Sequence, residues 1–355
     1  MTSEHGTWNV KQMPTFKCRL PLCILLTLLG GQTVAAQYTD EVVQRGSTPG
    51  SRMTIRCQII DYTGSELTYR QASSNKPRGI KASDVIKIRT AQTTAQKEGI
   101  KAFNEGKTRD AEFHFTEAVN SEPRIWMRRE ILSMMVRCAL KRNDYLTAGT
   151  RFQLLFESDP ETAHINLIPL LWNATSAKGE ARTAAISWLS DEKPVARLMA
   201  ASWLFFDPGY SEKSLTVFNE LARSPGDRIK QLASWQRIRF QIRAGDVTDF
   251  NLERWDTNIS KLDPALRPGP LFLLGRGHVV RQDFEIAAAT FLKVPLVYDS
   301  EHPLSAESMV EAGRALTRIG LRKDAAKLYS EVLDRYAYAS ISEDARQELS
   351  QLTAR

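Results

Sequence analysis

The stretch TAQKEGIKAFNEGKTRDAEFHFTEAVNSEP, residues 94–123, decides the fold of this chain. Its pattern predicts two short helices, Ala95–Asn104 and Arg109–Asn120. Gly106 marks the break between them, because glycine readily adopts the left-handed conformation that ends a helix. Pro123 ends the second helix, since proline lacks the backbone N–H that a helix needs. Small or aromatic residues recur where the two helices would touch, at Gly99, Ala102, Ala111, Phe115 and Ala118.

This spacing resembles the tetratricopeptide repeat, a helix–turn–helix unit of about 34 residues. The residues that carry the resemblance are Gly99, Gly106, Ala111, Phe115, Ala118 and Pro123. Ala95 and Ala102 stand where the family places a tryptophan and a tyrosine. One such unit cannot bury its own apolar face, so the resemblance implies neighbouring repeats. The expected fold class is therefore mainly α, an α-solenoid of tetratricopeptide-like helix pairs.

Three further segments repeat the pattern, and their small and aromatic residues are expected where paired helices approach each other. The predicted packing positions are Gly99, Ala111, Phe115, Ala148, Phe152, Gly275, Ala287, Phe291, Gly313, Ala325 and Tyr329. The matches assign residues 94–264 to helical repeats that are degenerate in the middle, and residues 265–355 to C-terminal tetratricopeptide-like repeats. Pro264, Pro268 and Pro270 form the predicted hinge between the two parts, because prolines interrupt regular structure.

The degenerate middle predicts helices without a clear tetratricopeptide pattern. The expected helices are Leu167–Ala174, Ala181–Leu189, Pro194–Phe206 and Lys213–Ala222, with two more between Ile229 and Trp255. Four positions also suit a HEAT-like helix pair: Arg197, Ala200, Ala201 and Leu204. Tryptophans recur here and are expected in the core rather than as sugar-binding platforms, at Trp172, Trp188, Trp203, Trp235 and Trp255.

The segment before the helices predicts β-structure. Residues 37–51 are polar, contain Pro49, and are predicted to be a linker. Residues 52–90 alternate apolar and polar side chains, as strands do. With a turn at Gly64 and a terminal Val-Ile-Lys-Ile, residues 85–88, they resemble the small, bent Sm-like and SH3-like barrels. That resemblance implies a peptide- or glycan-binding module. The alternative is a β appendage that packs on the first helical repeat.

The N-terminus predicts export. Basic residues precede the apolar run Leu20–Leu29, and small residues follow it, so residues 1–36 read as a signal peptide cleaved after Ala36. The alternative is an uncleaved anchor. The cleaved chain is expected in the periplasm or cell envelope of a bacterium, with no integral membrane span. The formal net charge is +7, and without residues 1–36, which hold three basic residues and one acidic residue, it is +5. The charges are interspersed, so nucleic acid is not an expected partner.

The motifs that mark common enzymes are missing from the sequence. It contains no GxSxG, HExxH, GxxxxGK[ST] or GxGxxG, and its histidines have no ligand spacing. We expect no catalytic residues, no cofactor and no metal. Cys57 and Cys138 are expected to be two buried thiols rather than a disulfide, because each falls on an apolar face.

The expected function is a non-catalytic protein-binding scaffold of the cell envelope. The tetratricopeptide resemblance implies that the first helix of each repeat lines a concave groove, which places Arg137, Arg276 and Arg314 there. Arginines hold carboxylates through paired hydrogen bonds, so acidic peptide segments are the expected partners. The alternatives are arginines that pair only with neighbouring acids, a glycan- or peptidoglycan-binding module that uses the β segment or the tryptophans, and an enzyme whose site comes from distant residues.

Overall fold

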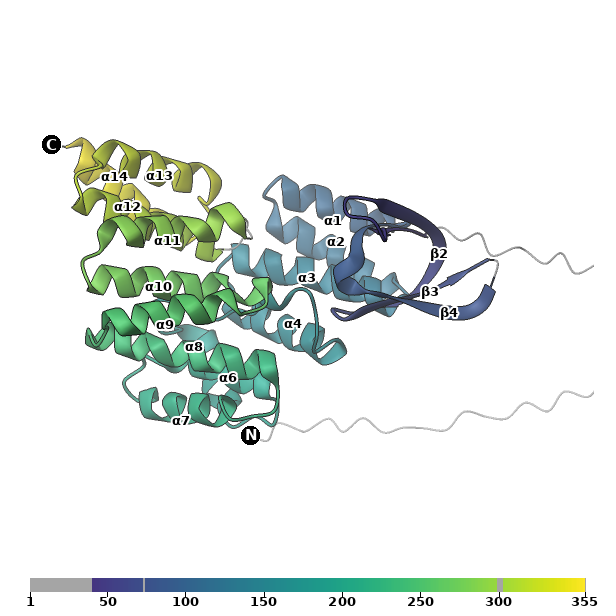
Figure 1. Ribbon diagram of the computed structural model, residues 1–355, viewed down its shortest axis with the longest axis horizontal. Coiled ribbons are helices and arrows are strands. Elements are labelled where there is room, and N and C mark those ends of the chain that lie inside the picture. Colours follow the sequence, from purple (N-terminus) through teal and green to yellow (C-terminus); the bar gives the residue numbers. More distant parts are fainter. Residues whose placement is uncertain (1–39, 73, 299–302, 355) are drawn as a thin grey trace, which may run out of the picture. The chain divides into compact units, whose positions relative to one another are not determined.

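The computed structural model describes residues 40–72, 74–298 and 303–354 (Figure 1). The chain divides into two units, Met1–Gln37 and Tyr38–Arg355, and every described residue belongs to the second. The predicted signal peptide and its cleavage site lie outside the described residues. Within them, consecutive helices pack against one another after a small N-terminal antiparallel sheet. The mainly α fold class is therefore confirmed.

Five antiparallel strands form an open sheet in the order β4-β3-β2-β1-β5. Their bounds are β1 Asp40–Arg45, β2 Arg52–Tyr62, β3 Glu66–Gln71, β4 Ser74–Lys81 and β5 Val85–Arg89. The long strand β2 is curved, and it pairs with β1 along its first half and with β3 along its second (Figure 1). Strands β4 and β5 end the described sheet as edges, so the predicted barrel does not appear as a closed sheet.

The linker predicted for residues 37–51 is wrong over Asp40–Arg45, which is strand β1. Its Val42 is fully buried, and its buried Asp40 accepts a hydrogen bond from the backbone N–H of Ile59 at 2.9 Å. Only alternate positions at the start of the strand are buried, so its own apolar signal is weak. Pairing with β2 and β5 on its two sides decides this strand.

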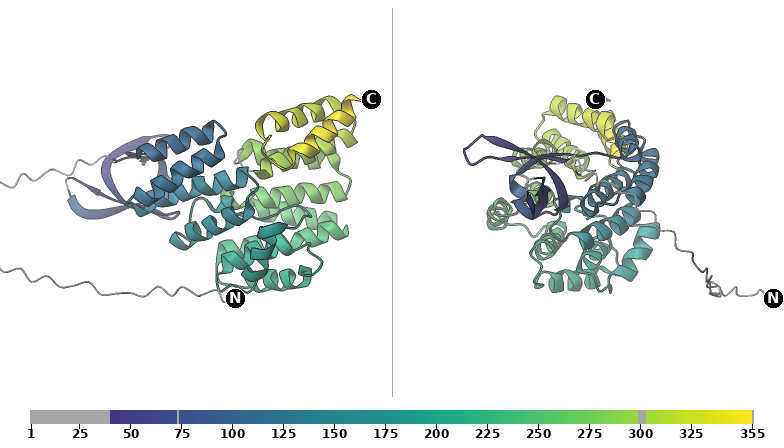
Figure 2. Two further views of the ribbon diagram at one scale, coloured as in Figure 1. Left: turned by 180° about the vertical axis from the view of Figure 1, so that it is seen from behind. Right: turned by 90° about the vertical axis from the view of Figure 1, so that its right-hand side faces the viewer.

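Fourteen α-helices follow in the described residues, and most consecutive helices lie side by side (Figure 2). Their bounds are α1 Thr94–Asn104, α2 Thr108–Ser121, α3 Ile125–Lys141, α4 Tyr145–Ser158, α5 Gly179–Trp188, α6 Pro194–Leu204, α7 Ser211–Leu221, α8 Asp227–Ala244, α9 Asp249–Ser260, α10 Pro268–Val280, α11 Phe284–Val297, α12 Pro303–Arg318, α13 Arg322–Arg335 and α14 Ser342–Thr353. None of these helices is long and apolar enough to span a membrane.

Glycines in three helix pairs lie against an aromatic ring of the partner helix. The pairs are Gly99 with Phe115, Gly275 with Phe291, and Gly313 with Tyr329. A methyl group at any of these glycines would approach ring atoms to 2.5–2.7 Å, so the missing side chain permits the close approach. Four alanines at the helix contacts are fully buried: Ala111, Ala148, Ala287 and Ala325.

The largest hydrophobic cluster runs from Val136 to Ala315. It includes Leu262, Leu266 and Leu271, which flank the prolines of the predicted hinge, so the core continues across that point. A second cluster joins the buried faces of the sheet and of α1–α3, and the sheet is therefore an appendage packed on the first helices. Four of the five mid-chain tryptophans are buried, and the fifth, Trp188, is partly buried.

The helix predicted at Leu167–Ala174 is wrong. A short 3-10 helix, η2, covers Ile165–Leu167, and residues 168–178, here called the linking segment, contain neither helix nor strand. Side chains of other helices bind much of its backbone. On α6, Trp203 Nε1 donates to the carbonyl of Pro169 at 2.6 Å, and the hydroxyl of Ser202 accepts from the N–H of Leu171 at 2.9 Å. These tertiary bonds replace the bonds that a helix would make.

Candidate functional site

The three arginines predicted to line a concave groove fall on α3, α10 and α12. Arg276 of α10 and Arg314 of α12 both donate to Glu311 of α12, at 2.7 and 2.9 Å. Arg314 also donates to Asp344 and to Glu348, each at 2.8 Å. Two of the three are therefore brought together, around acids of their own chain.

Arg137 is half-buried on α3, a helix that packs against α2 and α4. The arginines that form ion pairs with Glu311, in contrast, lie on α10 and α12. The arrangement at Glu311 is the one in which arginines pair with neighbouring acids of their own chain.

The linking segment is held by a buried arginine of α8. Arg239 donates to the carbonyl of Asn173 through Nε at 3.1 Å and Nη2 at 2.7 Å. Its Nη1 donates to the carbonyl of Ser202 at 3.1 Å and to the side chain of Gln236 at 2.6 Å. Burial lowers the pKa of Arg239 to about 9, because the charged form loses its hydration. The chain thus places its own backbone on the faces of α6 and α8.

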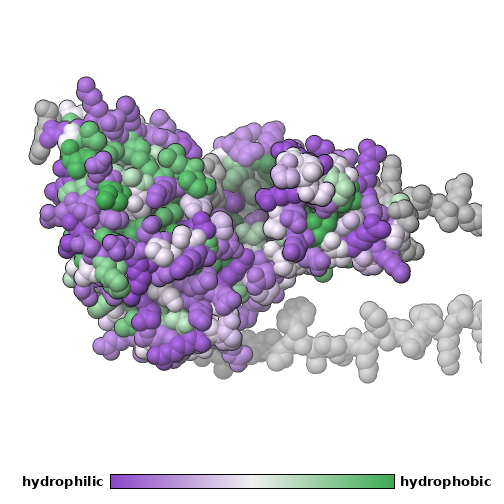
Figure 3. Space-filling view, in the orientation of Figure 1, coloured by the Kyte–Doolittle hydropathy of each residue, from purple (hydrophilic) through white to green (hydrophobic). Residues whose placement is uncertain are grey.

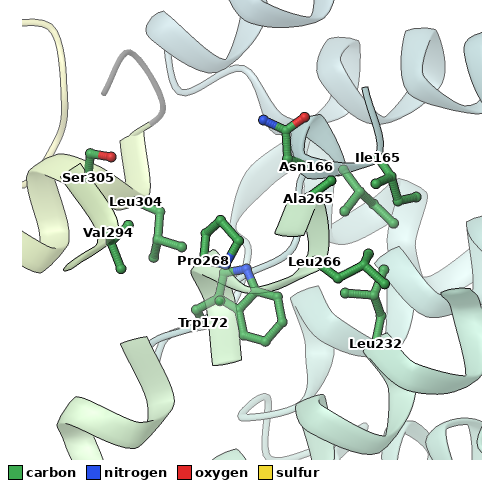
Figure 4. Close-up of a pocket in the computed structure, with 12 residues that line it drawn as sticks. Ile165, Asn166, Trp172, Leu232, Ala265, Leu266, Pro268, Val294, Leu304 and Ser305 are labelled. Carbon is green, nitrogen blue, oxygen red and sulfur yellow. The ribbon is translucent and has the colours of Figure 1, made fainter. Parts of the chain in front are cut away.

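A small cavity lies at the contact of this segment with η3 (Pro264–Leu266) and α10 (Figure 4). Apolar side chains surround it, among them Trp172, Leu232, Leu266 and Leu304. Its volume is about 30 Å³, which is the share of about one water molecule in the liquid. It is a packing gap rather than a ligand site.

A larger groove lies between strand β5 and helices α1 and α3, with a volume of about 440 Å³. Most of its lining is apolar: Val85, Ile86, Ile88, Ile100, Phe115, Trp126, Met127, Met134 and Ala163. Ile86 leaves 42% of its surface exposed, which is high for an isoleucine. Methionines adapt their shape to different occupants, so a groove with Met127 and Met134 suits a variable apolar side chain.

Two residues that line this groove each carry a buried polar atom without a hydrogen-bond partner in the described residues. The atoms are Oε1 of Gln96, an acceptor, and Nε1 of Trp126, a donor. Gln96 and Trp126 are only 5% and 2% exposed, and the amide of Gln96 makes just one weak bond, to the sulfur of Met127 at 3.2 Å. Buried polar groups are nearly always paired in proteins, so two unpaired ones at one groove are unusual.

One wall of the groove is an edge of the sheet. Strand β5 pairs with β1 on one side, and its other side has no strand partner among the described residues. An unpaired edge presents a row of N–H and C=O groups that can pair with an added strand. Ile86 and Ile88, which alternate on this strand, both line the groove.

The ionisable groups of the groove are few. Nε2 of His164 lies 3.0 Å from Oε1 of Glu130. Burial, together with the charge of Glu130, raises the pKa of Tyr62. No group of three His, Cys, Asp or Glu side chains in the described residues is arranged to hold a metal.

Cys57 and Cys138 are buried free thiols, as predicted, and burial raises their pKa to about 11 and about 12, so both stay protonated at neutral pH.

Sequence reasoning missed this groove. The only local signal was the Val-Ile-Lys-Ile run of residues 85–88, whose apolar residues exceed what one buried face needs. No protein-family model matches the chain, and no curated protein sequence matches it. The geometry of the groove therefore carries the functional argument.

Proposed function

We propose that the protein is a non-catalytic scaffold that binds an extended peptide segment of a partner protein in the groove beside β5. The observation that carries this proposal is the unpaired edge of β5 next to an apolar groove. An added strand would pair its backbone with the edge, and its alternate side chains would enter the groove. An incoming peptide also offers both donors and acceptors to Gln96 and Trp126, although both groups must first rotate out from under the protein atoms that cover them.

The wider setting of the proposal rests on the sequence. We propose an exported protein of a bacterial cell envelope, cleaved after Ala36, because basic, apolar and small residues follow one another in the order of a signal peptide. The mass of the protein from a secreting host should correspond to a chain that begins at Gln37. The helix pairs are proposed to form a tetratricopeptide-like solenoid, partly HEAT-like, as the glycine-on-aromatic contacts favour.

The arginine row and the tryptophans are weaker candidates for the binding site. Arg276 and Arg314 already hold Glu311. A sugar-binding tryptophan needs an accessible ring face, whereas Trp172, Trp203, Trp235 and Trp255 are at most 7% exposed. We therefore favour a peptide over a glycan.

The test uses peptides selected from a random displayed library on the full-length exported protein. Ile86→Asp introduces a charge in the groove and is expected to weaken binding of a selected peptide about tenfold or more. Ile60→Asp is the matched control, because Ile60 lies in the same sheet, is also 42% exposed, and does not line the groove. Fluorescence anisotropy measures the affinity, and circular dichroism checks the fold of both variants.

A second arm tests the strand pairing itself. N-methylation of alternate backbone amides in the peptide removes donors that an added strand needs, so one of the two methylation registers should abolish binding. Peptides that bind both variants equally, or that tolerate both registers, would place the binding site elsewhere and refute the proposal.

A further inference from the structure

A second groove, here called the outer groove, lies on helices α7, α8 and α9, away from the groove beside β5. Its volume is about 470 Å³. The helix positions that line it are Leu215 of α7, Ser234, Trp235, Arg237, Ile238, Phe240 and Gln241 of α8, and Arg254, Trp255 and Asn258 of α9. On α8 these are largely neighbours three and four apart, so they form one face of the helix.

The floor of this outer groove is apolar. Trp235 and Trp255 are 6% and 2% exposed, whereas Phe240 leaves 52% of its surface exposed. The surface around α7 and α8 that faces the viewer in Figure 3 is mostly hydrophilic with small apolar areas. A half-exposed aromatic ring beside buried rings offers an anchor point for an apolar side chain.

The charge of this groove has one sign. Arg237 and Arg254 line it, and no Asp or Glu does. Neither guanidinium has an ion pair or hydrogen bond within the described residues; Arg254 stacks on Phe250 at 5.7 Å. The three other arginines of α8 are engaged differently: Arg228 pairs with Asp263 at 3.0 Å, Arg239 is buried, and Arg243 lies over the ring of Phe206 at 4.7 Å. The amides of Gln241 and Asn258 add further hydrogen-bonding groups to the lining.

We infer that this outer groove binds an acidic peptide segment in which carboxylates flank an apolar side chain. The apolar residue covers Phe240, and the carboxylates meet Arg237 and Arg254, which can each bind a carboxylate through two hydrogen bonds. Two arginines form no extended basic stripe, so a protein segment fits better than a nucleic acid. This inference is independent of the groove beside β5, because the two grooves share no residue.

The probe is a labelled peptide with a central phenylalanine flanked by glutamates, compared with the same peptide carrying glutamines. We expect saturable binding of the glutamate peptide, weakened about tenfold or more when Arg237 and Arg254 are both changed to Gln. The control double variant changes Arg109 and Arg322 to Gln, which removes the same charge from exposed arginines outside the groove. That control should retain binding within about twofold.

A second pair of variants separates the contribution of the apolar anchor from that of charge. Phe240→Ala should weaken binding, and Phe113→Ala, at a phenylalanine of α2 that is 70% exposed, should not. Circular dichroism checks that all variants fold, and Ile86→Asp should leave this binding unchanged. Equal affinity for the glutamine peptide, equal loss in the two arginine double variants, preference for a single-stranded oligonucleotide, or no saturable binding up to about 1 mM would each overturn the inference.

Discussion

The linking segment and the groove beside β5 differ in whether the described chain occupies the surface between its secondary-structure elements. At the linking segment, the chain supplies its own backbone, and groups of α6 and α8 bond to it. At the groove, no described segment of the chain fills the space, and two buried polar groups have no partner among the described residues. The difference teaches that the helix faces at the linking segment are used for folding, so a binding site is better sought where polar groups lack partners.

The largest effect is expected from removing the contacts that hold the linking segment. Arg239→Met removes donors from the carbonyls of Asn173 and Ser202 and from the side chain of Gln236. Buried acceptors left unpaired cost about 1–3 kcal/mol each, and removal of a desolvated charge offsets part of this, so we expect a loss of about 3 kcal/mol in the free energy of unfolding. Urea denaturation measures it.

Arg237→Met is the matched control for that change, two residues earlier on α8 and exposed. It should alter stability by less than about 0.5 kcal/mol, as exposed substitutions usually do. Similar losses in the two variants would show that the buried contacts of Arg239 do not hold the linking segment.

The next effect concerns how the free energy of unfolding depends on pH through a carboxyl group that contacts the linking segment. Glu307 of α12 accepts a hydrogen bond from Asn173 at 3.0 Å, and burial raises its pKa to about 7. Below about pH 4.5 the carboxyl is protonated in both folded and unfolded chains. Between about pH 4.5 and 7 the unfolded chain releases the proton first, so this group lowers stability as pH rises.

Glu307→Gln removes this titration. The advantage of the variant over the parent protein in free energy of unfolding should grow by about 2–3 kcal/mol between pH 5 and pH 8. Urea midpoints measured across that range check the prediction. A difference that stays constant with pH would mean that Glu307 ionises normally.

The smallest effect is expected when the same Trp→Phe substitution is made at the linking segment and at the groove beside β5. Trp203 and Trp126 are both almost fully buried, but of the two indole N–H groups only that of Trp203 has a hydrogen-bond partner among the described residues. Trp203→Phe should cost about 1–2 kcal/mol more than Trp126→Phe, because the second change removes an N–H that bonds to nothing. Equal costs, by chemical denaturation, would contradict the assignment of Trp126 Nε1 as unpaired.

The helical architecture could be predicted from the sequence because it follows from local signals. Gly106 has a positive φ of 78°, as the helix break required, and α1 and α2 have the predicted order and almost the predicted bounds. The same holds for α6, which begins at Pro194 as expected. Helix periodicity and helix-ending residues act over a few positions, so a single sequence contains them.

Tertiary structure decided the elements whose partners lie far away in the chain. Strand β1 exists because β2 and β5 pair with it, and residues 168–174 avoid a helix because α6 and α8 bind their backbone. Both candidate grooves depend on elements brought together in the same way, such as Ile86 of β5 and Met134 of α3, which line one groove. The sequence by itself determined a helical chain with a β segment before it. Which polar groups find partners depends on contacts between residues distant in sequence, and only the folded structure sets those contacts.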